Sequence, residues 1–192
     1  MVAEHFSEKE VTSRVISLFR EIPQAVVLID GRSGSGKSSL AAALLGAIVL
    51  EDGIVQQPVI ELISMEDLYD GWSGLEQGAK TLEGLMQAKS AGAACEYRAY
   101  DWALGEFAEL RQLDPYKAWL VEGCGSISAA TVALSDLSIW VELAAETRLE
   151  RVILREPDAQ EWWLQWNEQH NAFIQREHSP EIAEYFITHS AI

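Results

Sequence analysis

Positive charge is scarce in this sequence. Its 192 residues include 14 Lys and Arg against 30 Asp and Glu, so the formal net charge is −16. Nucleic acids and anionic membrane surfaces repel such a chain, and we expect neither as a partner. Hydrophobic residues nevertheless make up 48% of the chain. This content excludes a disordered acidic tail and predicts one globular domain over residues 1–192.

Cysteine and long apolar runs are also scarce. Only Cys95 and Cys124 occur, without a C-x-x-C pair, so neither a disulfide framework nor a zinc site is expected. We interpret both as small buried residues in a reducing cytoplasm. The longest apolar stretch, residues 40–50, is shorter than the about 18 residues of a membrane span. Because no basic segment followed by an apolar run begins the chain, we expect no secretory signal and a cytoplasmic location.

The hydrophobic pattern predicts strands that alternate with helices. A capping box, Ser7 to Glu10, begins a helix over residues 7–22, which Pro23 ends. Strands are expected at 25–29, 59–63, 118–121, 137–143 and 185–188, and further helices at 37–47, 75–90, 148–155 and 162–174. Residues 92–113 mix aromatic and charged side chains and are not assigned. The alternation indicates an α/β domain of three layers around a parallel sheet.

A glycine-rich turn between the first strand and the next helix carries the most specific motif. Its residues, Gly31, Arg32, Ser33, Gly34, Ser35, Gly36, Lys37 and Ser38, match G-x-x-x-x-G-K-[ST] in full, and Ser39 follows. Glycines let successive amides converge on phosphate oxygens, and the helix N-terminus adds positive charge. Lys37 is expected to reach the β- and γ-phosphates, and Ser38 to bind Mg²⁺. The turn therefore predicts a site for ATP and Mg²⁺.

Other phosphate-binding classes lack support in the sequence. The chain contains neither the D-x-x-G and N-K-x-D motifs of GTPases nor an L-S-G-G-Q-like signature of transporter ATPases. The strand at 118–121 is followed by Glu122 and a glycine, where transporter ATPases have Asp-Glu. We expect Glu122 to hold a Mg²⁺-bound water, and an ordinary polar strand end is the alternative.

Three arginines share one helical face after the fourth strand. Arg148, Arg151 and Arg155 lie at i, i+3 and i+7. Small-molecule kinases have a lid at this place, whose arginines stabilise the phosphoryl group during transfer, so we predict a lid around residues 146–160. The alternative is a solvated face paired with neighbouring glutamates. Together with the two basic residues of the glycine-rich turn, these arginines predict a basic pocket in an acidic molecule.

Acidic and aromatic residues follow the second strand and recur near residue 100. Because ligands of an open α/β sheet bind at the carboxyl ends of strands, Glu66 or Asp67 is expected to accept a proton from an attacking hydroxyl. The candidate contacts of a planar, hydroxylated acceptor are Tyr69, Trp72, Arg98, Tyr100, Asp101 and Trp102. An acidic helix cap with packing aromatics is the alternative. We interpret Trp162, Trp163 and Trp166 as core or lid packing.

The motifs occur in the order Asp-Gly-Arg-Ser-Gly-Ser-Gly-Lys-Ser, acid-acid-Leu-Tyr, Tyr-Asp-Trp, Val-Glu-Gly and Arg-Leu-x-Arg. This order, over residues 25–190, resembles the uridine kinase and phosphoribulokinase group of P-loop kinases, and most closely its actinobacterial ATP-binding, uridine-kinase-like branch. The resemblance implies a sheet of about five strands in the order 2-3-1-4-5, ATP with Mg²⁺ as the donor, and a hydroxyl acceptor. It also implies a base at the position of Glu66.

The chain departs from that group at the acceptor. The group has an Asp where this chain has Glu66, and its His after Tyr-Asp-Phe and its Asp-His-Pro segment are absent here. The resemblance therefore implies an ATP-dependent kinase acting on a hydroxyl of a small molecule, nucleoside-like or of another kind. An ATP-binding module or slow ATPase without an acceptor is the alternative. The sequence does not decide between ATP and GTP. It also leaves the oligomeric state open, with a homodimer among the alternatives.

Overall fold

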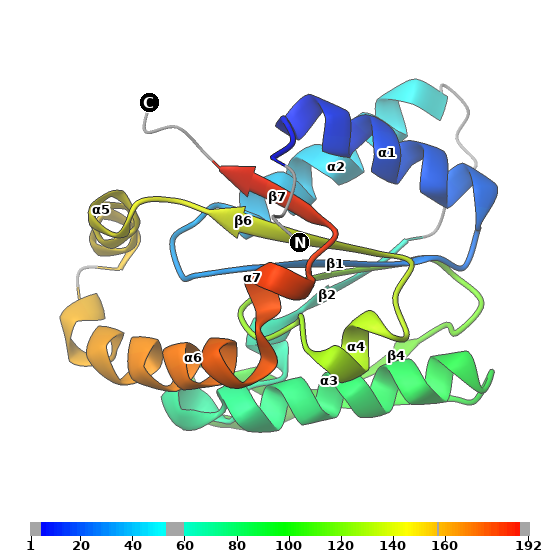
Figure 1. Ribbon diagram of the computed structural model, residues 1–192. Helices are drawn as coiled ribbons and strands as arrows, with labels where there is room; N and C mark the ends of the chain where they lie inside the picture. Colours follow the sequence, from blue (N-terminus) through cyan, green and yellow to red (C-terminus); the bar gives the residue numbers. More distant parts are fainter. Residues whose placement is uncertain (1–4, 53–59, 157, 189–192) are drawn as a thin grey trace.

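A five-stranded parallel sheet forms the centre of the computed structural model, which describes residues 5–52, 60–156 and 158–188 (Figure 1). Its strands are β1 (Val26–Gly31), β2 (Glu61–Ser64), β5 (Trp119–Glu122), β6 (Leu137–Glu142) and β7 (Tyr185–Thr188). They lie in the order β2-β5-β1-β6-β7, and every neighbouring pair is parallel. Counted within this sheet alone, the order is 2-3-1-4-5, which confirms the predicted topology.

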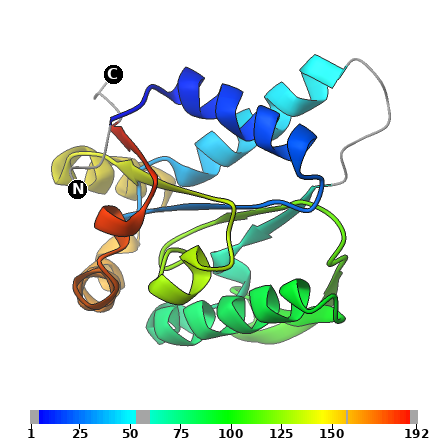
Figure 2. The same cartoon turned by 45° about the vertical axis from the view of Figure 1, so that its right-hand side comes forward.

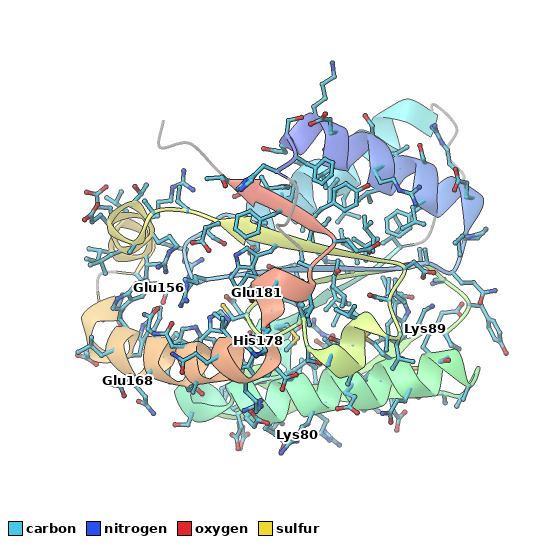
Figure 3. The ribbon with its side chains drawn as sticks, in the orientation of Figure 1. Lys80, Lys89, Glu156, Glu168, His178 and Glu181 are labelled. Carbon is cyan, nitrogen blue, oxygen red and sulfur yellow. The ribbon has the colours of Figure 1, made fainter. Side chains whose placement is uncertain are left out.

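Helices cover both faces of the sheet, so the molecule has three layers (Figures 1 and 2). One face carries α1 (Glu8–Glu21) and α2 (Lys37–Asp52), and the other carries α3 (Leu75–Ser90), α4 (Ala129–Val132), α6 (Trp163–Glu177) and α7 (Ser179–Ile182). Helix α5 (Ala145–Arg155) lies beyond the carboxyl end of β6. Charged side chains such as Lys80 and Glu168 project from the outer helix surfaces (Figure 3).

The central strands are apolar on both faces because each face meets a layer of helices. Val27 and Ile29 of β1 belong to the cluster under α1 and α2. Val26 and Leu28, the alternate residues, belong to the cluster under α3 and α6. A strand buried in this way has a continuous apolar sequence, as predicted for residues 25–29.

Residues 92–113, which the sequence left unassigned, contain an antiparallel hairpin outside the main sheet. It consists of β3 (Cys95–Asp101) and β4 (Glu106–Leu113). Buried and exposed residues alternate along β3, and the buried ones are Cys95, Tyr97 and Ala99. Strand β4 is exposed over nearly all of its length. The alternation of residue types in β3 could have predicted a strand. Strand β4 has no buried face, so its sequence shows no such alternation.

Most other elements agree with the sequence prediction, although it did not include the short helices α4 and α7, and α5 begins three residues before the predicted start. Both α3 and β7 have the predicted bounds, and the capping box begins α1, with the Glu10 amide donating to Ser7 Oγ and the Ser7 amide to the Glu10 carboxylate. Two predicted features, the start of β2 at Val59 and the interruption at Pro157, lie outside the described residues.

Within the described part of the chain, no helix is long and apolar enough to span a membrane.

Two glycine substitutions test the packing at the end of β5. Gly123 has a φ of 138°, and an added Cβ would lie 2.4 Å from Met65 Cβ. We expect Gly123→Ala to destabilise the protein by about 2–4 kcal/mol. Gly84, exposed in α3 with open space around it, is the matched control, and Gly84→Ala should stabilise by about 0.5–1 kcal/mol. Urea unfolding measures both, and equal stabilities of the two variants would contradict this packing.

Candidate functional site

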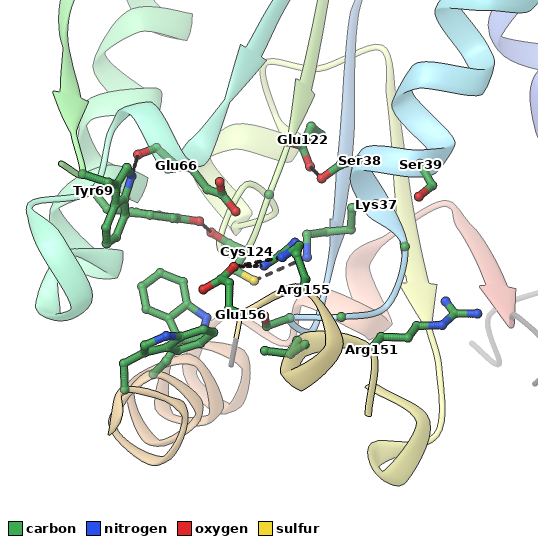
Figure 4. Close-up of a pocket in the computed structure, with 18 of the residues that line it drawn as sticks. Lys37, Ser38, Ser39, Glu66, Tyr69, Glu122, Cys124, Arg151, Arg155 and Glu156 are labelled. Carbon is green, nitrogen blue, oxygen red and sulfur yellow. Dashed lines mark hydrogen bonds and ion pairs between the residues drawn. The ribbon is translucent and has the colours of Figure 1, made fainter. Parts of the chain in front are cut away.

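A cavity of about 790 Å³ opens at the carboxyl ends of the parallel strands (Figure 4). Its walls come from the segments that follow β1, β2, β5 and β6, with further residues from α6 and the hairpin. An open α/β sheet binds its ligands at this edge. The lining of the cavity includes residues of the glycine-rich turn (residues 31–38), a set of carboxylates, two arginines of α5 and a group of aromatic rings.

The glycine-rich turn has the backbone geometry of a phosphate cradle. Gly34 and Gly36 have φ values of 80° and 102°, which favour glycine. A Cβ at Gly34 would also lie 2.6 Å from the Arg148 carbonyl oxygen, so the turn closes against α5 without space for a side chain. Helix α2 begins at Lys37, and its unpaired first amides face the turn.

Lys37 extends from the start of α2 toward the end of β5 (Figure 4). Its ammonium donates to the Arg32 carbonyl oxygen at 3.2 Å and contacts Cys124 Sγ at 3.5 Å. Burial opposes this charge, but the interactions with Cys124, Glu122 and Asp30 outweigh burial and raise the pKa of Lys37 above its ordinary value. The side chain therefore stays cationic in the cavity.

Ser38 and Glu122 meet beside Lys37, as the sequence predicted for a magnesium site. Ser38 Oγ donates to one Glu122 carboxylate oxygen and Ser64 Oγ to the other, each at 3.0 Å. Mg²⁺ prefers such oxygen ligands and keeps several waters, so it needs only one or two protein groups beside phosphate oxygens. The described residues contain no cluster of three or more acidic, His or Cys side chains that would hold a metal. The site thus fits a hydrated Mg²⁺ bound with a nucleotide.

A buried carboxylate beneath the turn holds the loop after β5. Asp30 accepts hydrogen bonds from the amides of Gly31, Gly125 and Ile127 at 2.6, 3.1 and 2.9 Å. His170 of α6 lies with Nε2 3.9 Å from the Asp30 carboxylate, and both side chains are buried. Burial raises the pKa of Asp30 to about 6 and lowers the pKa of His170 to about 4. The sequence prediction missed this pair, because α6 is remote from β1 along the chain.

The structure separates the three arginines that the sequence placed on one face. Arg148 is buried, and it donates to the carbonyl oxygens of Leu143 at 3.0 Å and Ser33 at 3.3 Å. It therefore anchors the first turns of α5 to the glycine-rich turn instead of facing the cavity. Arg151 and Arg155 are exposed and line the cavity.

The predicted basic pocket is smaller than expected. Lys37, Arg151 and Arg155 line the cavity, but Arg148 does not, and Arg32 donates to Asn171 outside it. Arg151 is directed away from the Lys37 ammonium (Figure 4). The spacing of the arginines contained no information on which backbone carbonyls would bind Arg148, so the prediction that all three arginines face one pocket was wrong.

The structure distinguishes the two adjacent acids. Glu66 lines the cavity, whereas Asp67 pairs with Arg111, accepts from the Tyr97 hydroxyl at 3.3 Å and lies outside the cavity. Both belong to η1 (Met65–Asp67) after β2. Partial burial and then the charge of Glu122 raise the pKa of Glu66. A carboxylate of raised pKa suits the role of a general base.

Five aromatic residues form one wall of the cavity, which we call the aromatic wall: Tyr69, Trp72, Trp102, Trp162 and Trp166. Trp72 stacks on Trp162 with ring centroids 4.0 Å apart and planes within 5°. It also contacts Trp102 and Trp166 at 4.6 and 6.0 Å. The buried Trp162 and Trp166 thus pack as predicted and in addition line the cavity.

Three predicted acceptor contacts belong to the hairpin instead of the cavity. Arg98 donates to a carbonyl across the hairpin, Asp101 accepts from two amides of its turn, and Tyr100 packs against neighbouring rings. Only Trp102 of this segment reaches the cavity, where its Nε1 donates to the Glu66 carbonyl oxygen at 3.0 Å. The polar residues of this segment therefore form hydrogen bonds within the hairpin and its turn.

The lining residues that the sequence prediction did not place in the site include Cys124 and Glu156, as well as Glu8, Gly123 and Val152. Cys124 and the second cysteine are free and buried, as interpreted, but Cys124 also faces the cavity. The sequence could have indicated Cys124, because it lies two residues after Glu122, the last residue of β5. The Tyr69 hydroxyl donates to its carbonyl oxygen at 2.7 Å and so connects the aromatic wall to the loop after β5.

Replacing His170 tests the buried pair beneath the turn. Its pKa is lowered from 6.5 to about 4, so between these values the unfolded chain binds a proton that the folded protein does not. The contribution of neutral His170 to stability is present above this window and is lost as the pH falls through it. His170→Gln should therefore cost about 1–3 kcal/mol more at about pH 7 than at about pH 4.5. Urea unfolding at both pH values measures this, and a cost independent of pH would contradict it.

Comparisons with known proteins identify the fold. No family model and no curated protein matches the chain. The structure of a "possible uridine kinase" from Bacillus stearothermophilus is similar, with a TM-score of 0.62 and 16% identity over 93% of this chain and 98% of that one. A "putative fructose transport system kinase" from Silicibacter sp. TM1040 gives a TM-score of 0.57 and 19% identity over 96% of this chain and 100% of that one. The chain therefore shares the fold of these two structures.

Proposed function

We propose that this protein is an ATP-dependent kinase that transfers a phosphoryl group to a hydroxyl of a small molecule. The observation that carries the proposal is one cavity that joins a phosphate-binding turn to a carboxylate free to act as a base. Lys37, Ser38 and Glu122 line it together with Glu66 and the aromatic wall. An ATP-binding module or slow ATPase needs only the first part, so the second part favours a kinase.

The donor end holds the nucleotide in this proposal. The amides of the glycine-rich turn and the Lys37 ammonium bind the β- and γ-phosphates, and the N-terminus of α2 adds positive charge. Ser38 and Glu122 hold Mg²⁺, which when bound neutralises charge on the transferred group. The hydrogen bonds from Ser38 and Ser64 to Glu122 orient its carboxylate for this role.

Glu66 is the proposed base. Its carboxylate accepts the proton of the acceptor hydroxyl while the hydroxyl oxygen bonds to the γ-phosphorus and the bond to the bridging oxygen of ADP breaks. Positioning and charge stabilisation supply most of the rate in such a transfer.

Helix α5 supplies the lid. Arg148 anchors its beginning to the Ser33 carbonyl oxygen, whereas its last turn carries Arg155 beside the cavity. A helix fixed at one end can bring its other end over the phosphates. Arg155 then stabilises the charge of the phosphoryl group during transfer.

Lys37→Ala tests the phosphate site. Because the Lys37 ammonium is the cation of the turn that lines the cavity, we expect the affinity for ATP·Mg²⁺ to fall by about tenfold or more, measured by calorimetry. Lys80→Ala is the matched control, since Lys80 lies on the outer face of α3 and should leave the affinity unchanged (Figure 3). Parent-like binding by Lys37→Ala would overturn the assignment of this turn.

A pH profile tests Glu66 as the base. Only the ionised carboxylate accepts a proton, so kcat should rise with pH through a pKa above the ordinary value for Glu. Glu66→Gln should lower kcat by about 10²–10⁴-fold and remove this rising limb. Asp67→Asn is the matched control, because Asp67 pairs with Arg111 outside the cavity and should keep the limb.

These profiles need an acceptor, which a screen supplies. ATP·Mg²⁺ is incubated with nucleosides, sugars and amino alcohols, and acceptor-dependent release of ADP is measured. Tight ATP binding without stimulation by any acceptor would favour the ATP-binding module over the kinase.

A further inference from the structure

We propose that the acceptor is a cationic alcohol, a molecule that carries an ammonium or similar cation near the hydroxyl to be phosphorylated. The transfer step of this inference rests on the proposed kinase function, whereas the cation site rests on the cavity alone. The acceptor end of the cavity combines the aromatic wall with two carboxylates, Glu66 and Glu156. Aromatic rings and carboxylates together form the chemistry that recognises organic cations.

The aromatic wall favours a cation over a stacked planar ring. Trp72 and Trp162 already stack on each other at 4.0 Å, which leaves no slot between them for a third ring. Trp102 and Trp166 contact Trp72 as well, so the rings use one another as stacking partners. A cation needs no slot, because it binds wherever it lies within about 6 Å of a ring centroid on the electron-rich face.

Glu66 supplies a negative charge that lacks a cationic partner within the described part of the chain. The ion pairs of those residues do not include it. Glu156, by contrast, pairs with Arg155 at 2.7 Å. When an acceptor displaces water from the cavity, Glu66 loses hydration, and an acceptor that brings the opposite charge offsets this loss.

The charges of Arg155 and Lys37 act on Glu66 more weakly than burial and the charge of Glu122, which raise its pKa. Lys37 is at the glycine-rich turn, Arg155 is held by Glu156, and Arg151 points away from Lys37. Glu66 and its neighbours therefore repel an anionic acceptor and give a neutral one no charge partner. In the transfer, the hydroxyl proton goes to Glu66 while the ammonium keeps its charge, so the cation also balances the carboxylate before reaction.

Matched ligand pairs test this inference. Choline and 3,3-dimethylbutan-1-ol share a shape and a hydroxyl but differ in charge, and so do N-(2-hydroxyethyl)pyridinium and 2-phenylethanol. Binding is followed by calorimetry and by tryptophan fluorescence of the aromatic wall, with and without ATP·Mg²⁺. We expect the cation to bind about tenfold or more tightly than its neutral counterpart in at least one pair. Equal binding within both pairs would overturn the inference.

Charge-removing variants locate the site. Glu66→Gln keeps the size of the side chain and should reduce the preference for the cation to about threefold or less, a readout that requires no turnover. Glu168→Gln is the matched control, because Glu168 is exposed on the outer surface of α6 and should keep the full preference (Figure 3). An unchanged preference in Glu66→Gln would overturn the assignment of the cation to this carboxylate.

The two proposals fail in different ways. Phosphorylation of neutral alcohols without a preference for cations would overturn this inference and leave the kinase function standing. A preference for cations, without acceptor-dependent ADP release, would support the cation site and overturn the kinase function.

Discussion

The site depends on the buried carboxylate of Asp30. This one group accepts the amides of Gly31, Gly125 and Ile127, so it fixes the glycine-rich turn and the loop after β5 relative to each other. Lys37 and Cys124 lie on these two segments, and their contact follows from that arrangement. A buried carboxylate is costly unless several donors satisfy it, which explains why three amides converge there.

The cavity divides its charges between two ends. Lys37 belongs to the glycine-rich turn, where an anionic nucleotide binds in our proposal, while Glu66 and Glu156 line the cavity together with the aromatic wall. The acidic composition of the chain is therefore more than a property of its surface, because carboxylates also enter the site. The few basic residues that line the cavity are placed by backbone contacts and ion pairs, such as those of Lys37 and Arg155.

Features that local sequence determines were predicted well. The helix over residues 75–90 and the glycine-rich turn belong to this class, because periodicity and backbone geometry dictate their residue types. The hairpin was missed, since β4 has almost no buried face to produce a pattern. The sequence also did not distinguish Glu66 from Asp67, because the partners of Asp67 are remote residues that only the fold brings together.

Trp102 is the residue of the hairpin that lines the cavity, and it donates to the Glu66 carbonyl oxygen, while Tyr97 and Arg111 of the hairpin contact the neighbouring Asp67. The hairpin lies outside the main sheet, and its outer strand is largely exposed. The inward residues of β3 belong to the core shared with the sheet, whereas mutations on exposed β4 and at the hairpin turn leave the sheet undisturbed. In our proposal, such an arrangement lets selection alter the choice of acceptor while the residues that bind the donor are inherited unchanged.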